Sequence, residues 1–225
     1  MKKLLSLLSV FALAAMAAGT ASAGSIATPT GLNPGDQFRF VFVTTTTTFA
    51  TSSDLSTYDN IVSSDATGYT YGGISPIWKA IVSNSITDAR DHIGLLSTSV
   101  VPLYTVNGAK VSGGNLWSGV LLSPMNVSIS GQTATFKVWT GSNTDGTKDS
   151  ASPLGTPGAP VSGYSGSMQH PWIRNSYESI TNELPVYGIS DVLTVPAAVP
   201  EPSTVMLVGL GGLAALGYSF KRKRA

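Results

Sequence analysis

The side chains best suited to bind a ligand lie in the segment SNTDGTKD, residues 142–149. Asn143, Asp145 and Asp149 offer hard oxygen atoms of the kind that ligate a calcium ion. Their spacing departs from that of a calcium loop, in which acids alternate and a glutamate closes the set. Asp-Gly is also a common turn pair, so we favour a simple turn and keep a ligand loop as the alternative.

Tryptophan side chains are a second candidate, because their rings can stack on sugars. Trp78 lies in an apolar segment and Trp172 follows a proline, so packing in the core is expected for most of the tryptophans. Trp139 is the exception, since it alternates with Thr135 and Lys137 and leads into the segment described above. The predicted ligand loop therefore includes Trp139, although core packing stays open for this residue too.

The acids, bases and nucleophiles of the chain form no recognisable catalytic set. GYSGS, residues 163–167, lacks the last glycine of a G-x-S-x-G nucleophile elbow. His92 and His170 are the only histidines, and we expect both to be structural or exposed. Asp88 and Asp91 flank an arginine, which favours a solvated ion cluster over the carboxylate pair of a glycosidase. We predict no catalytic residue, no metal site and no cofactor.

These candidates must be positioned by strands and a helix that the apolar pattern predicts. SSDLSTYDNIVSSDATG has the spacing of an amphipathic helix that begins after Ser52 or Ser53 and stops at Gly68. A short helical turn is expected in TDARDHI, residues 87–93. Alternation and β-branched residues predict strands within the segments 38–48, 76–83, 102–112, 126–141 and 183–195.

Two further signals concern turns and loops. Asn107-Gly108 between β-type flanks is the strongest hairpin signal in the chain. Residues 141–167 are rich in glycine, serine and proline, and we expect a long irregular loop that is either functional or poorly ordered. The order of elements favours an α+β fold, with a single domain over residues 24–198, a mainly antiparallel sheet and one or two helices.

Composition narrows the class of partner. Seven of the 13 Lys and Arg and eleven of the 12 Asp and Glu lie between residues 24 and 198, which gives this part a net charge of about −4. That balance argues against nucleic acid as a partner. The chain has no cysteine, which rules out thiolate metal sites and cysteine nucleophiles.

The N-terminal segment has the layout of a secretory signal peptide. Lys2 and Lys3 precede an apolar stretch, and Ala21-Ser22-Ala23 matches an A-x-A cleavage site. Ala21 and Ala23 therefore predict cleavage before Gly24, with residues 1–23 removed. The expected partners for this step are the Sec machinery and signal peptidase.

The C-terminal segment, residues 199–225, predicts a membrane anchor. Residues 205–220 are uncharged, and at about 1.5 Å per residue they nearly span a bilayer as a transmembrane helix. Lys221, Arg222, Lys223 and Arg224 follow as a stop held on the cytoplasmic side. The helix would hold the domain at the inner membrane, outside the cytoplasm.

The same segment resembles the PEP-CTERM sorting signal of Gram-negative bacteria. Val199, Pro200, Glu201 and Pro202 supply the motif, and the apolar helix and basic end follow in order. The resemblance implies an exosortase as processing partner, acting near the Pro-Glu-Pro. It also implies an association with exopolysaccharide and biofilm, and possible release to the cell surface after processing.

A second resemblance covers residues 36–190. FRFVFVTTTT, WKAIVS, DAR, PLYTVNGAKV, LWSG, VWTGSNTDGT, Trp172 and PVYGIS occur in the order seen in bacterial surface domains with a C-type-lectin-like or endostatin-like fold. The resemblance implies a helix packed on a twisted sheet, with residues 141–167 as the binding loop. The Glu-Pro-Asn, Gln-Pro-Asp and Trp-Asn-Asp motifs of sugar-binding members do not occur, so no calcium or sugar ligand carries over.

The sequence therefore predicts an exported, exosortase-sorted surface or extracellular-matrix protein. Its domain is expected to be a non-catalytic binding or structural module associated with exopolysaccharide. The alternative is a carbohydrate-active hydrolase that acts on the exopolysaccharide.

Overall fold

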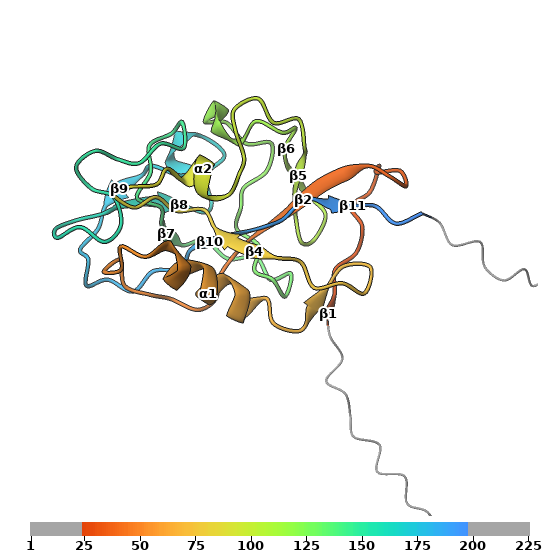
Figure 1. Ribbon diagram of the computed structural model, residues 1–225, viewed down its shortest axis with the longest axis horizontal. Coiled ribbons are helices and arrows are strands. Elements are labelled where there is room, and N and C mark those ends of the chain that lie inside the picture. The colour runs from red at the N-terminus through yellow and green to blue at the C-terminus, as the bar shows by residue number, and fades with distance from the viewer. Residues whose placement is uncertain (1–23, 198–225) are drawn as a thin grey trace, which may run out of the picture.

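A computed structural model describes residues 24–197, which Figure 1 shows in colour. The predicted signal peptide, sorting motif and C-terminal membrane helix lie outside the described residues, apart from Gly24. Between residues 24 and 197, no helix combines the length and the apolar character needed to cross a bilayer.

The described chain is mostly strand and loop, with few helices. Its strands are β1 (Gly24–Ser25), β2 (Gln37–Val43), β3 (Tyr69–Thr70), β4 (Trp78–Ala80), β5 (Leu103–Thr105), β6 (Lys110–Ser112), β7 (Lys137–Trp139), β8 (Val161–Tyr164), β9 (Ser176–Tyr177), β10 (Tyr187–Ser190) and β11 (Leu193–Thr194). Its helices are α1 (Leu55–Asp65), α2 (Ala89–His92) and the 3-10 turns η1 (Leu116–Ser118) and η2 (His170–Trp172). The predicted α+β class is confirmed.

The main sheet is built around β2. Its strand order is β4-β10-β2-β5-β6, with β11 paired to the start of β2. All its pairings are antiparallel except that of β2 with β5. A separate antiparallel sheet has the order β7-β8-β9, and β1 pairs with β3 in parallel. The mainly antiparallel arrangement therefore agrees with the sequence pattern.

The two faces of β2 pack into two different hydrophobic cores, because successive side chains of a strand point to opposite faces. Phe38, Phe40 and Phe42 are fully buried in the core that α1 covers. Val41 and Val43 are buried in the other core, under α2 and the 3-10 turns. Figure 1 shows α1 and α2 on opposite sides of the sheet. One charged residue, Arg39, interrupts the second face.

Helix α1 forms where the spacing predicted it, and Leu55, Tyr58 and Val62 are its buried side chains. Its N-cap is Asp54, whose carboxylate accepts from the backbone N–H of Ser56 at 2.9 Å, rather than the predicted Ser52 or Ser53. An ionised carboxylate is also favoured at this end by the helix dipole.

The predicted hairpin is present, and Gly108 adopts the positive φ of 92° that its turn requires. The predicted long loop is wrong in one respect, because residues 141–167 include β8, the central strand of the second sheet. The pattern of β8 is hidden by its small residues, Ser162 and Gly163. Gly163 is required because an added Cβ would lie 2.1 Å from the carbonyl oxygen of Trp172.

Candidate functional site

The segment 142–149 is a hydrogen-bonded turn. The amide of Asn143 donates to the carbonyl of Thr147, and the Asp145 carboxylate accepts from the amide and hydroxyl of Thr147 at 3.0 and 2.6 Å. Burial opposes ionisation of Asp145, but the hydrogen bonds from Thr147 together with the positive charge of Arg90 lower its pKa. The Oδ1 atom of Asp145 therefore accepts both of these hydrogen bonds within the turn, in agreement with the favoured interpretation.

Asp149 is buried and has a different set of partners. Its carboxylate accepts from the amides of Ala151 and Ser152 at 3.0 and 2.9 Å and forms an ion pair with Arg174 at 3.0 Å. The structure therefore ties Asp149 to Arg174 rather than to Asn143 and Asp145. Within residues 24–197, no three acidic or histidine side chains are grouped to hold a metal ion.

Trp139 does not line a surface site. Its side chain is fully buried in the core beneath α1, and its indole N–H donates to the carbonyl of Thr48 at 2.8 Å. The expectation of a surface position is wrong, because β7 pairs with β8 at Ser162 and bridges Val186, which closes the core over the ring. Trp78, Trp117 and Trp172 are buried, as expected.

The charged cluster near α2 is structural. Asp88 forms ion pairs with Arg90 at 3.5 Å and Lys148 at 3.4 Å. His92 lies 2.9 Å from Asp59, whose same oxygen accepts from the amide of Ala80 at 2.7 Å. The contacts of Asp59 tie α2 to α1 and β4, and the pairing of Asp88 with Arg90 agrees with the ion-cluster interpretation.

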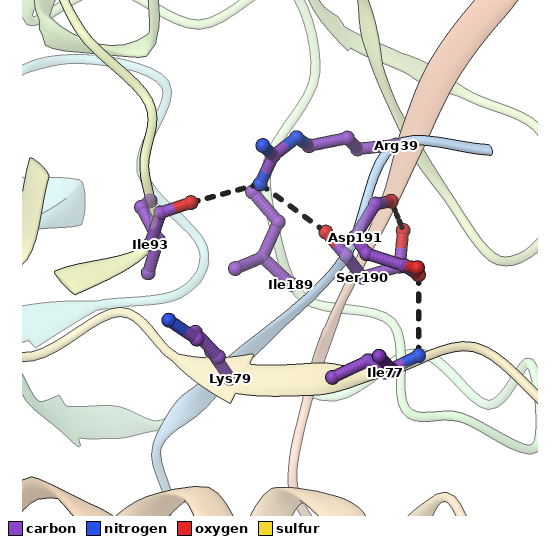
Figure 2. A pocket seen from close by; sticks show the side chains of 7 residues that line it. All are labelled: Arg39, Ile77, Lys79, Ile93, Ile189, Ser190 and Asp191. Carbon is purple, nitrogen blue, oxygen red and sulfur yellow. Dashed lines mark hydrogen bonds between the residues drawn. The ribbon is translucent and has the colours of Figure 1, made fainter. Parts of the chain in front are cut away.

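A different place in the fold has the character of a ligand site. A cavity of about 280 Å³ lies where the ends of β4 and β10 meet β2 and the residue after α2. Figure 2 shows its seven lining residues, which are Arg39, Ile77, Lys79, Ile93, Ile189, Ser190 and Asp191. Their chemistry is mixed, with three isoleucines, two cations and one carboxylate.

Strand pairing explains why these residues meet. Ile189 on β10 lies opposite Val41 on β2 and opposite Lys79 on β4. Arg39 lies two residues before Val41 and therefore projects from the same face of β2, toward the second core. The backbone amide of Ile77 donates a hydrogen bond to the carboxylate of Asp191 at 3.1 Å. This bond holds the two residues together at the rim of the cavity.

Arg39 is the unusual group in this cavity. One terminal nitrogen, Nη1, donates to the carbonyls of Ile93 at 2.9 Å and Ser190 at 3.4 Å, as Figure 2 shows. Its Nε is buried and has no hydrogen-bond acceptor. Burial lowers the pKa of Arg39, and the negative charge of Asp191 opposes that effect only in part. The guanidinium remains a cation, since the ordinary pKa of arginine is far above neutral.

Lys79 supplies the second cation. Its ammonium donates to the carbonyl of His92 at 2.8 Å, which leaves two of its three donors for other partners. The site therefore carries two positive charges and one negative charge. Such an arrangement can bind an anion next to an apolar wall.

A larger hollow, of about 430 Å³, has no charged side chain in its lining. It lies between the residues after α2 and η1, with Val100, Val120 and Leu122 exposed along it. Without a charged group it offers less to fix a ligand's orientation, so the Arg39 cavity is the stronger candidate.

The Arg39 cavity cannot be recognised from the sequence motifs alone. Arg39, Lys79 and Asp191 lie in predicted strand segments that are far apart in the sequence, and no motif connects them. The available signal was a single cation inside each of two apolar segments, FRFVFV and IWKAIV. A charged residue rarely lies on the buried face of a strand unless it has a partner.

Comparison with known families identifies one segment of the chain. Residues 198–223 match the PEP-CTERM protein-sorting motif, which includes Val199, Pro200, Glu201 and Pro202. No curated protein matches the chain. The match indicates an exported exosortase substrate with C-terminal membrane anchoring, in agreement with the sequence pattern.

Proposed function

We propose that residues 24–197 form a non-catalytic binding module of the extracellular matrix, which is sorted to the cell surface by an exosortase and associates with exopolysaccharide in a biofilm. The Arg39 cavity carries this proposal, because it is a preformed hollow with a few polar groups in an apolar wall. The sorting motif supports a position at the cell surface, where the domain would meet such a ligand.

Several carboxylates are held in structural contacts, which supports a non-catalytic role. Asp54 caps α1, Asp88 pairs with two cations, Asp149 pairs with Arg174, and Glu178 lies 2.6 Å from Lys137. Glycoside hydrolysis requires two carboxylates facing one substrate. The Arg39 cavity has only Asp191, and one of its oxygens already accepts from a backbone amide.

We also propose that the domain is C-type-lectin-like. Helix α1 on one face of the main sheet and the irregular segments around β8 agree with that resemblance. The proposed ligand contact then differs from the calcium-and-sugar loop of that family, because it lies at the ends of β4 and β10.

Binding of the exported full chain to the exopolysaccharide of its own cells tests the proposal. We expect retention on that polysaccharide with and without calcium, and no new reducing ends after prolonged incubation. Release of sugar fragments would establish the alternative, a carbohydrate-active hydrolase. Failure to bind any polysaccharide, with the fold intact, would leave a purely structural matrix protein and contradict the binding role.

A further inference from the structure

We infer that the Arg39 cavity binds one carboxylate group on a small ligand, such as the uronic acid unit of an acidic polysaccharide. The inference rests on the proposed function and names the chemistry of its ligand. It assigns roles to three side chains: Arg39 and Lys79 attract the carboxylate, and Asp191 restricts the site to ligands with a single negative charge.

The first argument is that Arg39 has no carboxylate within ion-pair distance. None of the ion pairs formed within residues 24–197 includes Arg39. Its hydrogen bonds go to two neutral carbonyls, and its Nε has no acceptor. Burial removes part of the hydration of this cation, and the two carbonyls and the more distant charge of Asp191 replace it only in part. A bound carboxylate would supply the missing charge.

The second argument is charge balance. Arg39 and Lys79 contribute two positive charges to the lining, and Asp191 contributes one negative charge. A monoanion therefore neutralises the site, whereas a phosphate monoester with nearly two charges would leave it with a net negative charge next to Asp191. This balance favours a carboxylate over a phosphate.

The third argument is size and surface. The cavity of about 280 Å³ lies just below the range of about 300 to 1,000 Å³ that is typical for ligand pockets. It therefore suits one sugar ring rather than a long segment of chain. Ile77 is 68% exposed at the rim and can cover the C–H face of a ring, while Ile93 and Ile189 form the buried floor.

A purely structural role for Arg39 is the competing explanation. Its Nη1 joins the residue after α2 to the end of β10, so an Arg39→Met variant can lose stability for that reason alone. Lys79 and Asp191 are better test positions. Both are exposed, and Asp191→Asn keeps an acceptor for the amide of Ile77.

The test is calorimetric titration of the full chain in detergent with three probes at low ionic strength: glucuronate, glucose and glucose 6-phosphate. We expect binding of glucuronate and no measurable binding of glucose. Lys79→Gln should weaken glucuronate binding about tenfold, because a charged hydrogen bond is lost. Lys110→Gln, at an exposed lysine of β6 outside the cavity, should have no effect.

Asp191→Asn should act in the opposite direction. Removing the negative charge is expected to strengthen glucuronate binding about threefold to tenfold and to admit glucose 6-phosphate. Equal binding of glucose and glucuronate would overturn the inference. Unchanged affinities in both Lys79→Gln and Asp191→Asn, with thermal unfolding unaltered, would overturn it as well.

The proposed matrix-binding role and the proposed ligand of the Arg39 cavity can be tested independently of each other. Glucuronate binding that depends on Lys79, without retention on the exopolysaccharide, would support the cavity's ligand class and contradict the matrix-binding role. Retention on the exopolysaccharide that is indifferent to Lys79 and Asp191 would support the binding role and overturn the assignment of the Arg39 cavity.

Discussion

Asp149 illustrates how a residue with ligand-like chemistry serves the fold instead. Burial opposes its ionisation, yet hydrogen bonds from the amides of Ala151 and Ser152 and from Arg174 outweigh that effect and lower its pKa. Hydrogen bonding to the ionised form thus stabilises the folded chain whenever the carboxylate is charged. Sequence spacing alone cannot distinguish this arrangement from a metal ligand.

The lowered pKa of Asp149 predicts a pH-dependent stability difference. Asp149→Asn should lower the free energy of unfolding at pH 7 by about 1 kcal/mol, a modest value because the side chain of Arg174 is 41% exposed. Because the pKa of Asp149 is lower in the folded chain, its charge stabilises the fold at pH values above the pKa of the unfolded chain, which is near 3.9. That stabilisation is lost as the pH falls through the pKa of the folded chain. Urea unfolding of both chains should therefore show the difference narrowing below about pH 5.

The matched control is Glu183→Gln, at an exposed carboxylate whose hydrogen bond to Thr47 is long, at 3.3 Å. It should unfold like the parent chain at every pH. A difference for Asp149→Asn that stays constant down to pH 2 would contradict the role assigned to its charge.

The close contact between α1 and β10 shows what positions the elements around the sheet. Gly188 on β10 lies against Phe42 of β2 and Val62 of α1, and an added Cβ would stand 2.6 Å from atoms of each. The absence of a side chain lets the helix approach the sheet. The position of α1 therefore depends on this glycine as well as on its own apolar face.

Gly188→Ala should lower the free energy of unfolding by about 1 to 3 kcal/mol, because the core beneath α1 would be overpacked. Gly113→Ala is the control, since its added Cβ meets nothing within 4 Å and should change stability by less than about 0.5 kcal/mol. Chemical denaturation measures both. The double variant Gly188→Ala with Val62→Ala should lose less free energy of unfolding than the two single variants lose together. Losses that simply add would contradict the proposed contact.

At the scale of the whole molecule, folded domain and sorting motif are close along the chain. β11 ends at Thr194, and Val195 still exchanges hydrogen bonds with Gly35 and Asp36, while the motif begins at residue 198. The domain is thus followed almost directly by the segment that an exosortase recognises.

A stop codon after Val199 should release the domain into the medium, because the residues predicted to anchor it are removed. The full chain, expressed in cells without exosortase, is the control and should sediment with membranes. Immunoblotting of medium and membrane fractions measures the partition. A truncated chain that remained with the membranes would refute the assignment of the anchor to residues 205–220.

The sequence by itself determined the features that depend on local pattern. Alternation in FRFVFV predicted β2, apolar spacing predicted α1, and Asn107-Gly108 predicted the hairpin. The sorting motif was also readable, because it consists of consecutive residues at 198–223. Periodicity and short motifs need no knowledge of which distant segments pair.

Only the tertiary structure decided the burial of Trp139, the strand β8 within the predicted loop, and the meeting of Arg39, Lys79 and Asp191. Arg39 and Ser190, which bound the cavity together, are separated by 151 positions in the chain. Their contact depends on the position of β10 between β2 and β4. That strand order depends in turn on the packing of the two hydrophobic cores. Sequence pattern shows which face of a strand is apolar, whereas strand order determines which charged residues are brought to the same place.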